Sequence, residues 1–156
     1  METNVARDQD RELWGLLRQA AHAVDRARED ELRHTGVSMV QAAILYIVKI
    51  VEGPVTPAKI SRWLLREPHS VSGLLNRMEK QGLVKKVKDL ERKNVIRVAL
   101  TQKGEEAYRQ SSEGKVVHNI LSCLSAEERD NLRAYLGRLR NKALQEHRPR
   151  SRWSFV

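Results

Sequence analysis

Residues 56–101 read TPAKISRWLLREPHSVSGLLNRMEKQGLVKKVKDLERKNVIRVALT, and this stretch decides the fold. It begins with Thr56 and Pro57, a typical helix start, because the hydroxyl caps unpaired amides and proline lacks the amide that a first turn leaves unpaired. The sequence Arg-Glu-Pro at residues 66–68 ends this first helix. A second helix then extends to Gly82, a residue typical of the left-handed conformation that ends helices.

The second helix is predicted to have two different faces. Its apolar residues follow the i, i+3, i+4, i+7 spacing of a single buried face. They are Val71, Leu74, Leu75 and Met78. The opposite face carries short, polar or basic residues, as a helix lying in a DNA major groove requires. These are His69, Ser70, Ser72, Gly73, Asn76, Arg77 and Lys80.

A β-hairpin is predicted to follow. Residues 83–89 and 95–101 are rich in β-branched and apolar side chains with partial alternation, which is typical of strands. The charged residues between them have no apolar reason to be buried. Helix, turn, helix and basic hairpin together predict a mainly α (α+β) fold, a winged helix-turn-helix with a small antiparallel wing. Val55 is expected to add a one-residue strand to it.

Helices are also predicted before this stretch. Residues 1–9 are expected to be frayed, and residues 10–33 to form a helix with one apolar stripe. Ser38 and Gln41 have the spacing of a capping box, which predicts a helix over residues 39–52. This helix is apolar almost all round, so we expect it to be central and buried.

Two further helices are predicted after the hairpin. Thr101 caps a helix over residues 102–124, within which Gly114 indicates a bend or a close contact. Ser125 and Glu128 form a second capping box that begins a helix over residues 126–147. The terminal helices carry more apolar surface than a small wing domain needs, which favours a two-fold homodimer. The single chain 1–156 thus divides into dimerisation helices (10–36 and 102–148) and a DNA-binding region (37–101).

The positive charge is concentrated in one part of the chain. The 156 residues include 29 Lys and Arg against 20 Asp and Glu, a net charge of +9. Residues 54–103 hold 12 basic and 4 acidic residues, so this third of the chain carries +8 of that charge. Such a distribution indicates a polyanionic partner, and its coincidence with a helix-turn-helix favours double-stranded DNA.

Several other classes of protein are excluded by the sequence. The first twelve residues are charged and resemble no secretory signal, and the apolar run 42–48 is too short to cross a membrane. One cysteine cannot form a disulfide framework or a cysteine-rich zinc site. We find no nucleophile–base pair, glycine-rich phosphate loop or clustered carboxylates. We therefore expect a cytoplasmic protein that is not an enzyme and uses no cofactor or metal.

Three segments resemble the MarR family of bacterial and archaeal transcription regulators. They are VSGLLNRMEKQGLV (71–84), the wing DLERK (89–93) and its closing LTQKG (100–104). The resemblance covers nearly the whole chain, because the flanking helices also fit. It implies interlocking terminal helices and a repressor that a small aromatic effector releases from DNA. A two-fold dimer presents its recognition helices roughly 34–36 Å apart, or a multiple of that, which predicts a pseudo-palindromic operator.

Particular residues are predicted to contact DNA. Base edges are expected to meet His69, Ser70, Ser72 and Asn76, since serine donates or accepts and asparagine pairs with adenine through two bonds. Gly73 departs from the larger polar residue frequent in the family, and its lack of a side chain lets the backbone approach DNA closely. Phosphates are expected to meet basic residues that position the protein without reading sequence. These are Lys59, Arg77, Lys80 and Lys86.

The wing tip is expected to enter the minor groove. Arg92 is the predicted contact, because narrow A·T tracts attract arginine. Asp89 would hold this arginine or brace the turn. The family often has Asp and Arg where this chain has Glu91 and Lys93, so either Arg92 or Lys93 could be the residue that inserts.

Alternatives stay open for the cysteine and the aromatic residues. Cys123 could sense oxidants, but its place on an apolar helix predicts a buried structural thiol. Trp14, Tyr46 and Trp63 are candidates to line an effector pocket, as the resemblance implies, and are equally well explained as core. The alternative function is an architectural DNA-binding protein with little sequence preference. A ratio of specific to non-specific affinity of ~10³ or more would favour a regulator instead.

Overall fold

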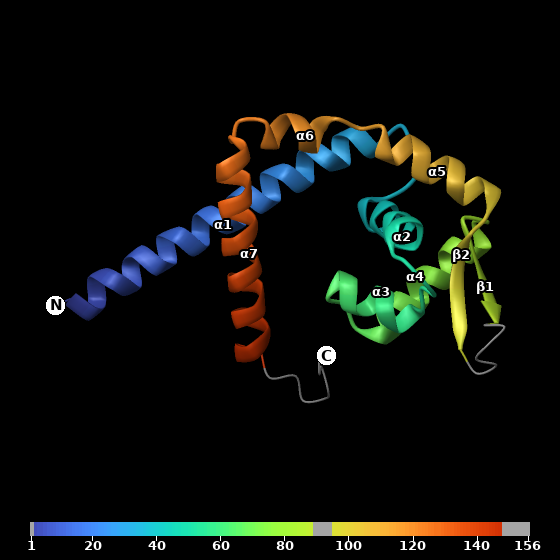
Figure 1. Cartoon of the computed structure of the whole chain (residues 1–156), viewed down its shortest axis with the longest axis horizontal. Helices are drawn as coiled ribbons and strands as arrows, with labels where there is room; N and C mark the ends of the chain where they lie inside the picture. The colour runs from blue at the N-terminus through green and yellow to red at the C-terminus, as the bar shows by residue number, and fades with distance from the viewer. Residues whose placement is uncertain (1, 89–94, 148–156) are drawn as a thin grey trace. The chain divides into compact units, whose positions relative to one another are not determined.

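The computed structural model describes residues 2–88 and 95–147 (Figure 1). Its elements are α1 (Glu2–Leu32), α2 (Met39–Ile50), α3 (Pro57–Leu64), α4 (Pro68–Lys80), β1 (Val84–Lys88), β2 (Ile96–Leu100), α5 (Gln102–Ser112), α6 (Val116–Leu121) and α7 (Ala126–Glu146). The chain forms two compact units, residues 1–116 and 117–156, which are described separately. The predicted winged helix-turn-helix, mainly helical with a two-stranded wing, is confirmed.

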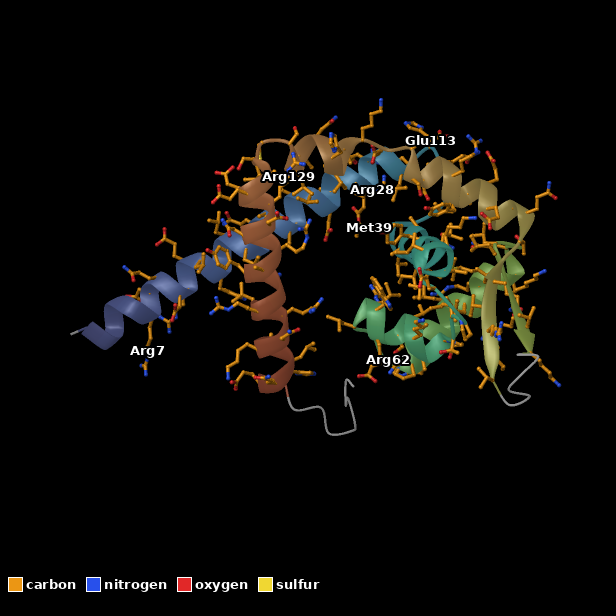
Figure 2. The ribbon with its side chains drawn as sticks, viewed as in Figure 1. Arg7, Arg28, Met39, Arg62, Glu113 and Arg129 are labelled. Carbon is orange, nitrogen blue, oxygen red and sulfur yellow. The ribbon has the colours of Figure 1, made fainter. Side chains whose placement is uncertain are left out.

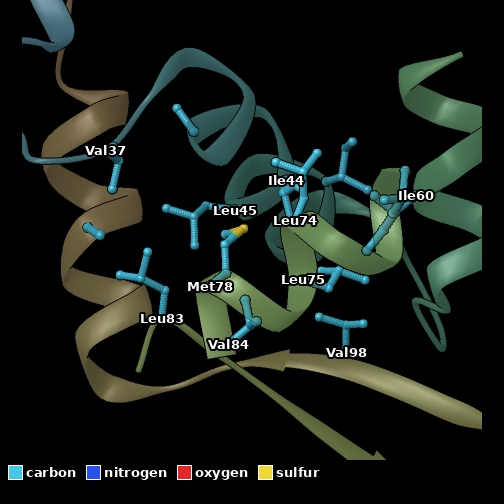
Figure 3. Close-up of a cluster of buried hydrophobic side chains, with 14 of the residues drawn as sticks. Val37, Ile44, Leu45, Ile60, Leu74, Leu75, Met78, Leu83, Val84 and Val98 are labelled. Carbon is cyan, nitrogen blue, oxygen red and sulfur yellow. The ribbon is translucent and has the colours of Figure 1, made fainter. Parts of the chain in front are cut away.

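The core of the first unit is built around α2. Ser38 caps this helix through the predicted capping box with Gln41, and the helix ends at Ile50. Ile44 and Leu45 are fully buried and belong to a cluster that includes Leu75 and Met78 of α4 (Figure 3). The predicted central helix is thus confirmed. Its packing fixes the helix-turn-helix on the body of the unit.

The turn between α3 and α4 is tight. Thr56 accepts a hydrogen bond from the amide of Lys59, as expected of an N-cap. Leu65 then adopts a left-handed conformation with φ of 50°, which is uncommon for a residue other than glycine. The buried Ser61 hydroxyl donates to the Arg66 carbonyl at 2.5 Å and supports this turn. Pro68 occupies the first turn of α4, where its missing amide leaves no helical bond unmade.

The wing is an antiparallel pair of strands. β1 and β2 pair in the register Val84↔Leu100 to Lys88↔Ile96. The Val55 carbonyl accepts a hydrogen bond from the Val98 amide at 2.8 Å. The sheet itself has two strands, so Val55 adds one backbone hydrogen bond beside it and not a full strand. Gly82 has φ of +72°, as predicted from its place after α4.

Thr101 and Gly104 join the segment that follows β2 to the residues that precede β1. The Thr101 hydroxyl accepts from the Gly104 amide at 3.0 Å and donates to the Gly82 carbonyl at 2.5 Å. Gly104 is buried, and a Cβ atom there would overlap the Leu83 carbonyl oxygen and lie 3.0 Å from its carbon. Because these neighbours are backbone atoms, they cannot rotate away.

We expect Gly104→Ala to lower the free energy of unfolding by about 1–3 kcal/mol, the usual range for overpacking a filled site. The matched control is Gly137→Ala in α7, because a Cβ there meets nothing within 4 Å. Chemical denaturation of both variants measures the difference. Equal stability of the two variants would contradict the close packing of Gly104 on Leu83.

The N-terminal helix is longer than predicted. Residues 1–9 were expected to be frayed, but α1 already begins at Glu2. This segment contains no glycine or proline to interrupt a helix. The expectation of fraying was therefore wrong for residues 2–9.

The helix predicted over residues 102–124 is divided into α5 and α6. The division occurs where Arg28 of α1, labelled in Figure 2, contacts the Ser111 carbonyl. Glu31 of the same helix contacts the Val116 amide. Arg28 donates to the Ser111 carbonyl and pairs with Glu31 at 2.5 Å, while Glu31 accepts from the Val116 amide at 2.9 Å. Gly114 leaves the space that these two side chains occupy. The predicted bend is thus a complete break.

The pKa of Glu31 reflects this junction. Burial alone would raise the pKa, but the hydrogen bonds from Val116 and Arg28 and the charge of Arg28 hold it below its ordinary value. A carboxylate with a lowered pKa in the folded state stabilises the fold above its unfolded pKa, about 4.3. That stabilisation is lost as the pH falls through the folded pKa.

We expect Glu31→Gln to lower the free energy of unfolding at pH 7 by about 1–3 kcal/mol, since a charged partner of buried donors is removed. The difference from the wild type should shrink as the pH falls below about 4.3, the unfolded pKa, and should vanish below the lowered folded pKa, where Glu31 itself becomes protonated. Urea titrations at pH 7, 5 and 3.5 measure this, with the exposed Glu29→Gln as control. If the difference in free energy of unfolding between the wild type and Glu31→Gln did not depend on pH, Glu31 would not be ionised at the junction.

The second unit contains α7 and most of α6. Ser125 and Glu128 form the predicted capping box, and Arg129 donates to the carbonyls of Leu121 and Leu124 at 3.0 and 3.1 Å. Cys123 is exposed, so the expectation of a buried thiol is wrong for the single chain. None of the described residues 117–147 is buried, because this unit has no core of its own.

Candidate nucleic-acid interface

The two faces of α4 differ as the sequence predicted. Its apolar residues are buried, and they anchor the helix in the core. The residues predicted to contact bases or phosphates lie on the other side. His69, Ser72, Asn76, Arg77 and Lys80 are exposed, whereas Ser70 and Gly73 are partly buried. α4 therefore presents one polar, basic surface, and the DNA contacts assigned to it stay predictions.

Gly73 is not required by close packing against any of the described residues. A Cβ atom at this position would meet nothing within 4 Å. Glycine inside a helix costs roughly 0.5–1 kcal/mol relative to alanine, because it loses more backbone freedom on folding. Among the described residues, none explains this glycine by close packing, and its role at a DNA contact stays a prediction.

The basic residues differ in how freely they can reach a phosphate. Lys80 on α4 and Lys85 and Lys88 on β1 are exposed. Lys59 on α3 is partly buried, and its ammonium donates to the Glu52 carbonyl at 3.2 Å. The exposed lysines are the better placed to contact a polyanion.

Lys86 lies in a different environment from the other lysines of β1. It is partly buried, its ammonium donates to Asn76 Oδ1, and it pairs with Glu79 at 3.5 Å. Glu79 also accepts from the Lys86 amide at 3.1 Å. Sequence reasoning missed Glu79, because a contact between a helix and a following strand has no fixed spacing in the sequence.

The wing-tip candidates Asp89, Arg92 and Lys93 lie outside the described residues. The strands that lead to the tip are described, from Val84 to Lys88 and from Ile96 to Leu100. The predicted minor-groove contact therefore stays a prediction.

The aromatic candidates for an effector site are not part of the core. Trp14, Tyr46 and Trp63 are exposed to 63%, 49% and 54%, so the alternative explanation as core residues is wrong. Arg18 lies 5.7 Å from the centre of the Trp14 ring, within the range of a cation–π contact. A hollow of about 310 Å³ opens where α1 meets α2. Its lining includes Leu32 and Val37 but none of the three aromatic residues.

Among the described residues, 2–88 and 95–147, no group of three or more His, Cys, Asp or Glu residues is arranged to hold a metal ion. No helix in the same part of the chain has the length and apolar character needed to cross a membrane.

Comparisons with known proteins agree with this architecture. The MarR family model matches residues 35–99. The uncharacterized HTH-type transcriptional regulator YybA of Bacillus subtilis (strain 168) is 25% identical over an alignment of 141 residues, which covers 87% of this chain and 87% of YybA. Both similarities include the helix-turn-helix and most of the wing.

Solved structures extend the likeness to almost the entire chain. The organohalide-sensing regulator RdhR-CbdbA1625, in its 2,4-dichlorophenol-bound form, is 30% identical with a TM-score of 0.76. The match covers 95% of this chain and 91% of that one. The fold is shared with MepR of S. aureus in complex with DNA, at 21% identity, a TM-score of 0.74, and 82% and 94% coverage. The chain belongs to the MarR family of winged helix-turn-helix transcription regulators.

Proposed function

We propose that this sequence-specific transcription regulator is a dimeric cytoplasmic repressor that binds a pseudo-palindromic operator and has no catalytic activity. The polar and basic outward surface of α4 is the observation that carries the proposal. An apolar inner face fixes the helix in the core, so its outer side chains are held ready to read a major groove. The excess positive charge of residues 54–103 supports the same partner.

A second copy of the chain is the proposed partner of the terminal helices. Leu13, Leu16 and Leu17 of α1 are exposed to 63%, 61% and 41%. Tyr135, Leu136 and Leu139 of α7 are exposed to 56%, 41% and 51%. Apolar stripes of this kind usually meet another protein, and a two-fold dimer is the commonest arrangement. The proposed dimerisation helices are residues 10–36 and 102–148.

A small aromatic molecule is the proposed effector. The 2,4-dichlorophenol-bound regulator is 30% identical to this chain, which supports a ligand of similar chemistry. The exposed rings of Trp14, Tyr46 and Trp63 are candidate contacts for it. The effector would favour a dimer in which the two recognition helices no longer match the operator spacing.

We expect Ser72→Ala and Lys80→Ala to weaken DNA binding in different ways. Loss of a base contact at Ser72 should lower affinity for the operator by about 5- to 150-fold, and affinity for scrambled DNA should not change. Loss of a phosphate contact at Lys80 should lower the affinity for the operator and for scrambled DNA alike. It should also reduce the slope of log affinity against log salt by about 1. Fluorescence anisotropy with a duplex from upstream of the protein's own gene measures these affinities.

Two results would count against the proposal. Equal binding of the wild type to operator and scrambled duplexes would favour an architectural protein over a repressor. If Ser72→Ala lowered the affinity for the operator and for the scrambled duplex equally, Ser72 would not be one of the residues that read bases.

We also expect Gly73→Ala to act oppositely on stability and on DNA binding. Alanine should raise the free energy of unfolding by about 0.5–1 kcal/mol, because it favours the helix. The added methyl group should lower operator affinity by about tenfold if the α4 backbone closely approaches DNA. Thermal unfolding and the same anisotropy assay give the two values.

Gly15→Ala in α1 is the matched control, because a Cβ at Gly15 also meets nothing within 4 Å. This variant is a control for stability alone and should gain a similar amount, because Gly15 lies in one of the proposed dimerisation helices. If Gly73→Ala were more stable and bound the operator as tightly as the wild type, close approach of the backbone to DNA would be disproved.

A further inference from the structure

Three side chains join the recognition helix to the first strand of the wing. The Lys86 ammonium donates to Asn76 Oδ1 and pairs with Glu79 Oε2 at 3.5 Å. Glu79 Oε1 accepts from the Lys86 backbone amide at 3.1 Å. Asn76 and Glu79 are one turn apart on α4, so Lys86 is held from two points of the helix. We name Asn76, Glu79 and Lys86 the α4–β1 clamp.

The chemistry of lysine determines which atom of Asn76 remains available. An ammonium group can only donate, so the amide atom facing Lys86 must be the oxygen. Reading adenine through two bonds requires that same oxygen to accept from the base while the nitrogen donates. While the clamp is closed, Lys86 occupies one of the two lone pairs of this oxygen and holds the Asn76 side chain toward β1, away from the geometry that two bonds to adenine require. The charge of Lys86 is likewise already paired with Glu79.

The position of the clamp explains why it is polar. Alternate residues of a strand share a face, so Lys86 lies on the same side of β1 as Val84. Val84 is 1% exposed and packs in the core, whereas Lys86 is partly buried at the next position outward. A two-stranded hairpin is only marginally stable by itself. Near the core, apolar packing of Val84 holds β1 in place. Farther along the strand, the clamp provides the contacts between β1 and α4.

We propose that Asn76, Glu79 and Lys86 are positioning residues, which set the orientation of the wing on the recognition helix and do not themselves contact DNA. This inference rests on the proposed function, because an oriented wing matters only if helix and wing bind the same duplex. It changes the roles predicted from sequence for Asn76, as a base reader, and for Lys86, as a phosphate contact.

Lys86→Met tests the role of the lysine, with Lys80→Ala as the comparison. Lys86→Met should lower operator affinity by roughly five- to tenfold through misorientation, without changing the slope of log affinity against log salt. Lys80→Ala should reduce that slope by about 1, as loss of a phosphate contact does. Binding is measured well below the melting temperature of each variant, so that a simple loss of stability leaves affinity unchanged. If Lys86→Met reduced the slope of log affinity against log salt as much as Lys80→Ala does, the proposal would be overturned.

Substitutions of Asn76 separate a clamp from a base contact. Asn76→Ala removes the acceptor for Lys86 and should also lower operator affinity by roughly five- to tenfold. The double variant Asn76→Asp with Glu79→Gln restores an acceptor, keeps the local charge unchanged and removes the amide donor of Asn76. It should bind the operator within about twofold of the wild type. A loss equal to that of Asn76→Ala would show that the amide contacts DNA, and the proposal would fail.

Hydrogen exchange of the DNA-free protein tests the clamp independently of any operator. The amides of Val84–Lys88 should exchange faster in Lys86→Met than in the wild type, while those of the buried α2 should not change. Unchanged exchange in β1 would overturn the clamp even if DNA binding were normal. Conversely, a wild type that prefers no duplex would refute the proposed repressor, and the exchange result would still decide whether the clamp orders the wing.

Discussion

The burial of α2 is the constraint on which the rest of the first unit depends. Ile44 and Leu45 have no exposed surface, and α2 packs against α3, α5 and β2. Each such side chain contributes roughly 1.5–3 kcal/mol when fully removed from water. Because α3, α4 and the wing pack around one apolar helix, the inner faces of all these elements are committed to the core. Their outer faces are then free to be polar and basic without loss of the fold.

Local features of the fold could be predicted from the sequence because their causes are local. The caps at Ser38, Thr56, Thr101 and Ser125 depend on a side chain and an amide three residues away. Gly82 was predictable as the end of α4 for a similar reason, since its φ of +72° favours glycine. The spacing of apolar residues on α4 likewise identified its buried face.

Features that depend on distant contacts could not be predicted. The break between α5 and α6 involves Arg28 and Glu31, more than 80 residues earlier in the chain. The contact of Lys86 with Asn76 joins a strand to a helix, and no sequence pattern indicates it. Cys123 and Trp14 lie among apolar neighbours in the sequence, which suggested burial, yet both are exposed in the single chain. Apolar periodicity shows that a face avoids water but not which molecule covers it.

The single bond between Val55 and Val98 has a mechanical consequence. It fastens β2 to the segment between α2 and α3, whereas β1 is fastened to α4 through Lys86. The two strands are themselves paired in a fixed register. A movement of the α2–α3 segment relative to α4 would therefore strain the pairing between the two strands. The hairpin thus acts as a tie between two parts of the first unit that are separate in the sequence, the α2–α3 segment and α4.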